Sequence, residues 1–353
     1  MDVAIIVYLL DGSHVTIPAT QDMLVRDLKA AIVARLCLKP LEAATCGFFQ
    51  ISAQGLDIFI SEDTMLVDVY SPKNRLIKRL LFTLIVPDVS GVRSVVEDSK
   101  LRAKCSLPEY YSECSAVYRG MLIHHALDKI RRGHVLAHSD RFLEGASDLC
   151  CYFIAVKYGA LILKLNQHII PLEVSQDLKH TAWDPEALTE SVMQGIYRDA
   201  RSLLKYSSQD AILLDFLYCF SKLALYDSLS IPAMWIGDLV NKGGGQTVKM
   251  TDRPDAEKSI HCYLLLTREY ICLASRDSMQ IIKSVPVQSL RRLFYYSDYL
   301  SLYFSMPQGQ ELYLNLSVIC TENCARLIET YYTISYHMLS RYRQTVEVTP
   351  GNW

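Results

Sequence analysis

The chain has 353 residues, half of them hydrophobic and 21% charged, which suits two or three globular domains. A formal net charge of −2 argues against a dedicated nucleic-acid-binding protein, which would carry a clear basic excess. No apolar run reaches the ~20 residues of a membrane span, and Asp2 stands where a secretion signal would carry positive charge.

The 11 cysteines contain no CxxC pair, and most lie within apolar periodic stretches. This pattern favours reduced cysteines that act as small core residues in a cytoplasmic protein. Cys320 and Cys324 lie four positions apart but have no paired His/Cys ligands nearby, and His124 and His125 are interpreted as solvated or core-edge histidines. The sequence therefore predicts no metal site and no cofactor.

Residues 1–90 have the pattern of a ubiquitin-like lobe. An Asp11–Ser13 turn joins two predicted strands, and Asp22 opens a predicted helix that ends at Lys39-Pro40. The predicted strands are Val3–Leu10, His14–Pro18, Phe48–Ser52, Leu56–Ile60 and Leu80–Val86.

A basic segment precedes the last of these strands. It contains Lys73, Arg75, Lys78 and Arg79 and no acidic residue. Two interpretations stay open. The segment is either a solvated edge that discourages strand-to-strand aggregation, or one wall of a site for anionic lipid.

Residues 100–227 are predicted to form a helical lobe. Its helices run from about Ser115 to Arg132, from a cap at Ser139, and from Asp184-Pro185, which combines a capping residue with proline at the first helical position. The last helix, within Ser207–Asp227, has a broad apolar stripe typical of a helix inside a lobe: Leu213, Phe216, Leu217, Phe220, Leu223 and Ala224.

Residues 232–342 switch to the period of strands, and residues 343–353 are interpreted as a tail. The predicted strands are Ile260–Thr267, Glu269–Ser275, Gln280–Lys283, Ser289–Ser297, Leu300–Ser305 and Glu311–Ser317. Thr321 then caps an amphipathic helix. Antiparallel strands closed by one helix describe a PH/PTB-like sandwich, in which the strand beside the helix leaves a groove for an extended peptide.

The predicted groove lies between the strand Leu290–Tyr296 and the closing helix. Arg291 and Arg292 are expected to meet acidic groups, whereas Phe294 is equally compatible with core packing. The complete predicted peptide site is Leu290, Arg291, Arg292, Leu293, Phe294, Tyr295, Leu327 and Tyr331.

Taken together, these elements resemble the FERM domain family over nearly the whole chain. The resemblance rests on Cys46–Phe49 in an early strand, on the serine-led helix Ser207–Asp227, and on the strand and helix Leu290–Ser297 and Thr321–Tyr332. Three features depart from the family pattern. Asp227 replaces a glycine, Phe59 replaces a tryptophan, and the closing strand Leu80–Val86 lacks alternating lysines and arginines. The resemblance implies an α+β cloverleaf of a ubiquitin-like β-grasp, a helical bundle similar to acyl-CoA-binding protein, and a PH/PTB-like sandwich.

The resemblance also implies a function. FERM domains are adaptors that couple cytoplasmic tails of membrane proteins to the cytoskeleton or to signalling at the plasma membrane, and many bind phosphoinositides. The basic segment falls where ezrin-like members carry lipid-facing lysines. A regulatory module, autoinhibitory or bound by a small GTPase, is the alternative. The sequence has no GxxxxGK(S/T), HExxH or GxSxG motif, so no enzyme is predicted.

Overall fold

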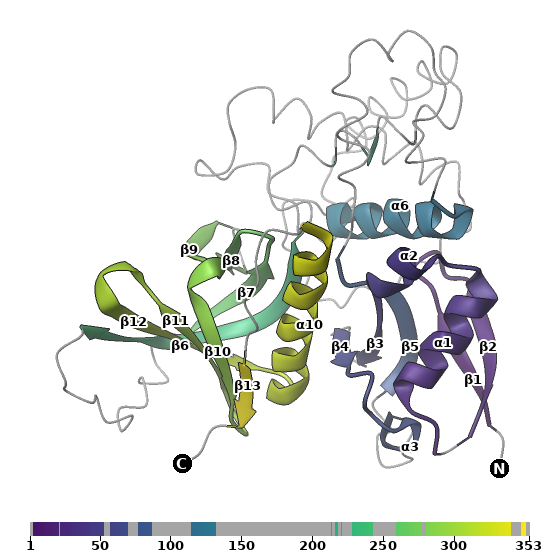
Figure 1. The fold of residues 1–353 in the computed structure, drawn as a ribbon, viewed down its shortest axis with the longest axis horizontal. Helices are drawn as coiled ribbons and strands as arrows, with labels where there is room; N and C mark the ends of the chain where they lie inside the picture. Colours follow the sequence, from purple (N-terminus) through teal and green to yellow (C-terminus); the bar gives the residue numbers. More distant parts are fainter. Residues whose placement is uncertain are drawn as a thin grey trace, which may run out of the picture. The chain divides into compact units, whose positions relative to one another are not determined.

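The computed structural model describes residues 3–20, 22–52, 57–69, 77–86, 114–131, 228–242, 259–276, 280–339 and 347–350, together with Leu213, Phe216, Leu217 and Phe220. The chain divides into two compact units (Figure 1). The first is Met1–Gly55 with Glu62–Asp227, and the second is Leu56–Ser61 with Ser228–Trp353.

The N-terminal part is built around a mixed five-stranded sheet. The strands are β1 (Val3–Tyr8), β2 (His14–Ala19), β3 (Cys46–Ser52), β4 (Asp57–Ile60) and β5 (Ile77–Leu84). They lie in the order β2-β1-β5-β3-β4, with β1 parallel to β5 and antiparallel to β2. A hairpin followed by a helix and a central parallel pair is the β-grasp arrangement, so the predicted ubiquitin-like fold is confirmed.

Three helices accompany this sheet: α1 (Val25–Leu36), α2 (Pro40–Ala44) and α3 (Leu66–Val69). Val25, Leu28 and Ile32 form the buried face of α1. The predicted end of this helix at Lys39-Pro40 was wrong, because α1 already ends at Cys37, whose φ of 53° is left-handed. Pro40 instead begins α2, where its missing N–H costs no hydrogen bond.

Helix α6 (Ala116–Arg131) confirms the helix predicted from Ser115 to Arg132. Its apolar face buries Tyr118, Leu122 and Ala126. In the Ser207–Asp227 stretch, the four described residues are helical, and the rings of Phe216 and Phe220 stack at 6.2 Å. Phe216, Leu217 and Phe220 are buried, as the apolar stripe predicts. The helices predicted at Ser139 and Asp184 lie outside the described residues.

His124 on α6 makes the stability of the first unit sensitive to acid. Burial lowers the pKa of its imidazole, against an opposing effect of nearby Asp11. An unfolded histidine titrates near ~6.5, so below that pH the unfolded chain binds more protons than the folded one. We therefore expect the free energy of unfolding to fall as the pH drops from 7.5 to 5.5.

Urea unfolding at the two pH values, followed by circular dichroism, measures this effect. The His124→Gln variant should lose less stability across the interval than the wild type. His14→Gln, which changes an exposed histidine of the same unit, should behave like the wild type. An acid response that His124→Gln leaves unchanged would contradict the assignment to this imidazole.

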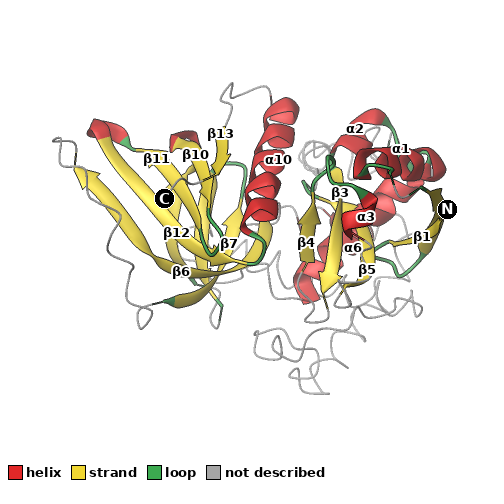
Figure 2. Ribbon diagram, turned by 90° about the horizontal axis from the view of Figure 1, so that it is seen from below, coloured by secondary structure: helices red, strands yellow, loops and turns green. Residues whose placement is uncertain are grey.

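The second unit contains one eight-stranded sheet in the order β13-β10-β11-β12-β6-β7-β8-β9. Figure 2 shows its strands in yellow, with helix α10 in red. The strands are β6 (Leu229–Lys242), β7 (Ile260–Leu266), β8 (Tyr270–Ser275), β9 (Ile281–Pro286), β10 (Leu290–Tyr295), β11 (Leu300–Ser305), β12 (Gln310–Val318) and β13 (Glu347–Pro350). Short 3-10 turns η4 (Val287–Ser289) and η5 (Pro307–Gly309) precede β10 and β12. All pairings are antiparallel except β10 with β13.

Helix α10 (Thr321–Leu339) closes this sheet, as predicted. Thr321 Oγ1 donates a hydrogen bond of 2.5 Å to the carbonyl of Tyr296, which fixes the start of the helix at the end of β10. The buried face of α10 is Cys324, Ala325, Leu327, Ile328, Tyr331 and Tyr332. An antiparallel sheet with a closing helix confirms the predicted α+β class of this unit. In the described part of the chain, no helix is both long and apolar enough to cross a membrane.

Candidate peptide-binding edge

The candidate site is the side of β10 that faces away from β11. On its inner side β10 pairs with β11 from Leu290↔Phe304 to Tyr295↔Leu300, with a bulge between Leu290 and Arg292. Leu290 and Leu293 are only 1% and 0% exposed, so their side chains belong to the core. Arg292 is exposed, and Arg291, Phe294 and Tyr295 are half-buried.

The outer side of β10 is paired with the chain's own β13. The register is Arg292↔Glu347, Leu293↔Val348, Phe294↔Thr349 and Tyr295↔Pro350, in the parallel direction. The prediction of a vacant slot beside this strand is therefore wrong for this structure. The segment interpreted as a tail supplies a strand of the sheet.

The direction of β13 follows from the path of α10. The helix begins beside Tyr296 at the end of β10, contacts β10, and spans about 28 Å at 1.5 Å per residue. Figure 1 shows α10 running back along β10 and β13 descending again beside it. The chain reverses direction between β10 and α10 and again between α10 and β13. Strand β13 therefore runs in the same direction as β10, and the two strands pair in parallel.

Leu327 and Tyr331, the two predicted site residues on α10, are 4% and 0% exposed. The ring of Tyr331 meets that of Tyr332 edge-on, with centroids 5.1 Å apart. The burial of Leu327 and Tyr331 places both side chains in the core of the unit, and not on the surface where the sequence predicts that they meet a peptide.

The two arginines of β10 differ in their exposure and in their surroundings. Arg291 Nη1 donates hydrogen bonds to the carbonyls of Gln288 at 2.8 Å and Leu290 at 3.3 Å, so it braces the preceding turn. The exposed Arg292 stands opposite Tyr303 in the register. The Tyr303 hydroxyl donates a hydrogen bond to Glu311 Oε1 at 3.0 Å. Burial raises the pKa of this phenol, and the hydrogen bond to Glu311 raises it further.

Sequence reasoning missed two features around this edge. The first is β13, whose only local signal is the short alternating run Val346–Thr349. The second is two pairs of tyrosines: Tyr296 stacks on Tyr299 at 4.2 Å in the turn between β10 and β11, and Tyr303 of β11 packs on Tyr313 of β12 at 4.9 Å. The second pair is ten positions apart in the sequence, and only the register of the two strands brings its rings together.

The predicted lipid site is only partly covered by the described residues. Lys73 and Arg75 lie outside them. Lys78 and Arg79 belong to β5, which begins at Ile77, earlier than the predicted start at Leu80. Arg79 is paired with Ile51 in the backbone register. The anionic-lipid site stays a prediction.

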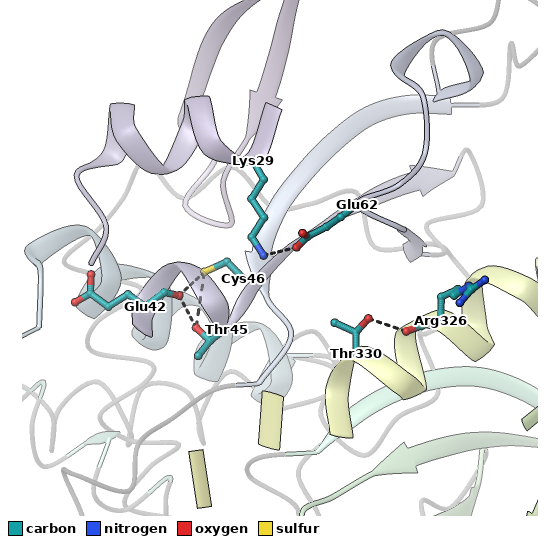
Figure 3. A network of polar contacts seen from close by, with 7 residues as sticks. All are labelled: Lys29, Glu42, Thr45, Cys46, Glu62, Arg326 and Thr330. Atoms are coloured by element: carbon teal, nitrogen blue, oxygen red, sulfur yellow. Dashed lines mark hydrogen bonds and ion pairs between the residues drawn. The ribbon is translucent and has the colours of Figure 1, made fainter. Parts of the chain in front are cut away.

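Buried polar groups in the first unit have a structural role. Glu42, 6% exposed, accepts hydrogen bonds from the backbone N–H of Lys39 at 2.9 Å and of Ser115 at 2.7 Å. Its carbonyl accepts from Thr45 Oγ1 at 2.8 Å and from Cys46 Sγ at 3.3 Å, as Figure 3 shows. Burial raises the pKa of the Cys46 thiol to about 12, so it stays protonated at neutral pH. Among the described residues, no group of three His, Cys, Asp or Glu could hold a metal ion.

Comparison with solved structures identifies the architecture. The chain matches the second MyTH4-FERM region of myosin VII from Dictyostelium discoideum, with a TM-score of 0.62 and 10% identity over 94% of its own length. It also matches the complex of the FERM and C-terminal domains of Drosophila Merlin, with a TM-score of 0.57, 8% identity and coverage of 96% of this chain and 97% of that one. A third match is the human myosin 7b C-terminal MyTH4-FERM domain bound to the harmonin-a PDZ3 domain, with a TM-score of 0.52, 13% identity and 96% coverage.

The chain has the fold of a FERM domain. It spans 59% of the Dictyostelium myosin VII structure and 60% of the myosin 7b structure, which are longer. No family model matches the sequence, and no curated protein matches it. The relationship is therefore one of fold, and it does not reveal a partner.

Proposed function

We propose that this chain is a non-enzymatic adaptor that binds an extended peptide at the edge of β10. The observation that carries the proposal is β13 itself, because the outer N–H and C=O groups of β10 already accept a strand over four residues. A peptide bound at this edge would take the place of β13 in the same ladder of hydrogen bonds. The Merlin and myosin 7b structures support a binding role, since each contains its FERM domain in a complex.

The surface around the edge suggests the chemistry of the ligand. Arg292 is exposed beside the edge and would favour an acidic residue at the matching position. Phe294 and Tyr295 are half-buried and offer apolar contacts to flanking side chains. A cytoplasmic tail of a membrane protein, or a segment of a signalling or cytoskeletal protein, fits this description.

Binding of tail peptides tests the proposal. In the full chain, the double variant Arg292→Glu/Phe294→Ala changes surface side chains and leaves Leu290 and Leu293 in the core. We expect it to weaken a binding peptide at least about 10-fold, since truncating a central contact commonly costs more than about 1.4 kcal/mol. Fluorescence anisotropy with labelled tail peptides gives the affinity.

Arg276→Glu is the matched control, because it reverses a charge at the end of β8, far from β10 in the strand order. It should bind like the wild type. Thermal unfolding of all variants checks that the sheet is intact. Equal affinities for the double variant and the control would rule out the β10 edge as the site.

We further propose that the basic segment brings the module to anionic membrane. The support is its composition: Lys73, Arg75, Lys78 and Arg79 without an acidic neighbour between them. Each basic residue near an anionic surface contributes about 1 kcal/mol, so Lys73→Glu/Arg75→Glu should reduce binding to phosphoinositide vesicles at least about 10-fold. This pair lies outside β5. Sedimentation with neutral vesicles is the control, and equal binding of variant and wild type would remove the lipid proposal.

A further inference from the structure

The outer face of strands β10, β11 and β12 carries tyrosines that the proposed peptide edge does not use. Successive side chains of a strand point to opposite faces of its sheet. Leu293, Leu302 and Leu314 lie opposite one another in the register and are 0%, 0% and 1% exposed, so they mark the face that points into the core. The residues one position before and after each of them belong to the other face.

Four half-buried tyrosines define what we call the tyrosine face: Tyr296, Tyr299, Tyr303 and Tyr313. At one end, the rings of Tyr296 and Tyr299 stack at 4.2 Å in the turn between β10 and β11. At the other end, Tyr303 and Tyr313 lie opposite each other in the register, with ring centroids 4.9 Å apart. The exposed Arg292 continues this second row on β10.

Two small polar residues lie between the two tyrosine pairs. Ser301 and Asn315 face each other in the register and are 1% and 7% exposed. In the described part of the chain, Ser301 Oγ and Asn315 Oδ1 have no hydrogen-bond partner. Burial raises the pKa of the Tyr313 phenol, and Glu311 and then Tyr296 raise it further, so Tyr296 and Tyr313 approach each other across Ser301. A buried polar atom without a partner costs about 1–3 kcal/mol, which a ligand reaching between these rings would recover.

We propose that the tyrosine face binds a proline-rich peptide in the polyproline II conformation, with one basic residue beside the prolines that meets Asp298. Tyrosine combines a flat apolar ring with a hydroxyl group, and surfaces lined by aromatic rings are the usual receptors of polyproline II helices. The face is a second binding site of the unit. It does not depend on the β10 edge, because it uses side chains and not the outer backbone groups of that strand.

The dimensions of the tyrosine face fit this ligand. Tyr299 and Tyr303 are four residues apart on one strand, a separation of about 13 Å, and four residue steps of polyproline II cover about 12 Å. With three residues per turn, such a helix can turn positions i, i+1, i+3 and i+4 toward one surface. The residues between the two contacts then pass over Ser301 and Asn315. The Ser301 hydroxyl can donate to a peptide carbonyl, and Asn315 Oδ1 can accept from the N–H of a non-proline residue.

Charge complementarity determines the residue that flanks the prolines. Asp298 is exposed and precedes Tyr299 in the turn, so this end of the face is acidic. At the other end, Arg292 lies opposite Tyr303, and Glu311 accepts the hydrogen bond of the Tyr303 hydroxyl, so the two charges offset each other. A lysine or arginine is therefore favoured beside Asp298, and an acidic residue at that position would be repelled.

The test uses the full chain and two labelled peptides of three Pro-Ala-Pro repeats, one with an arginine before the repeats and one with it after them. Proline has no N–H, so these peptides are poor partners for a ladder at the β10 edge. We expect one of them to bind, and Tyr303→Ala/Tyr313→Ala to weaken it at least about 10-fold. Tyr270→Ala, which removes a half-buried tyrosine from β8, is the matched control and should bind like the wild type.

Two further measurements do not depend on removing a ring. Asp298→Lys should weaken the arginine peptide by about 3- to 5-fold, as expected for an exposed ion pair, and should prefer the same peptide with glutamate in place of arginine. A sheet that is merely destabilised would not exchange one charge preference for the other. In the wild type, the amide NMR signals of Ser301 and Asn315 should shift as the peptide is added.

Four outcomes would each overturn the inference: no binding of either peptide by the wild type, equal affinities of the double tyrosine variant and Tyr270→Ala, no change of charge preference in Asp298→Lys, or unmoved signals of Ser301 and Asn315. The proposed function fails separately. A tail peptide at the β10 edge should bind Tyr303→Ala/Tyr313→Ala as it binds the wild type. Displacement of the proline peptide by the tail peptide would show one shared site and would also remove the second one.

Discussion

Tyr331→Ala is expected to lower the free energy of unfolding of the second unit by about 3–5 kcal/mol, the usual cost of deleting a large buried ring. Tyr331 is 0% exposed and lies in the middle of the face that α10 presents to the sheet. Its removal would leave a cavity under the helix, and α10 would lose one of the large side chains of its buried face. Urea unfolding followed by circular dichroism measures the loss.

Tyr331→Phe is the matched control for this prediction. It keeps the ring and removes only the hydroxyl, so it should cost about 1 kcal/mol. A loss below about 1 kcal/mol for the alanine variant would show that α10 contributes little to this unit. The helix would then be a poor support for the paired edge.

Glu42→Ala is expected to cost the first unit about 3 kcal/mol, because it removes a buried carboxylate that accepts hydrogen bonds from two partly buried backbone N–H groups. The donors belong to separate segments, Lys39 before α2 and Ser115 before α6. We therefore expect the variant to loosen α6 from the rest of the unit. Faster amide exchange in α6, together with a lower unfolding temperature, would record this effect.

A second glutamate of the same unit provides the control. Glu62 forms an ion pair with Lys29 at 2.6 Å, and its side chain is 50% exposed. Exposed ion pairs contribute about 0–1 kcal/mol, so Glu62→Ala should have a much smaller effect. Equal losses for the two variants would contradict the structural role assigned to the Glu42 carboxylate.

Most strands of the second sheet could be predicted because they are regular. Between Ile260 and Val318, turn residues separate short runs rich in apolar and aromatic residues, so the sequence predicts all six strands within a few residues of their ends. Strand β6 was missed because it contains Pro232 and Gly237, which normally interrupt a strand. In the structure Gly237 has a φ of 140° at a bulge, and Pro232 pairs in register with Tyr263.

The candidate site was less predictable than the fold. The arginines and aromatic residues of β10 single it out locally, and Thr321 marks the start of the closing helix. Whether the edge is open depends on a contact between Leu293 and Val348, 55 positions apart. No local pattern encodes such a pairing, and a four-residue strand cannot be distinguished from a tail by its composition. The burial of Leu327 and Tyr331 likewise depends on how the helix is rotated against the sheet.

The position of β13 has a consequence for engineering this module. Its four residues, Glu347–Pro350, lie along the outer side of β10. The buried face that holds the closing helix lies elsewhere, between Thr321 and Leu339. Substitutions in the strand would therefore change the pairing at the edge and leave the buried face of the helix as it is.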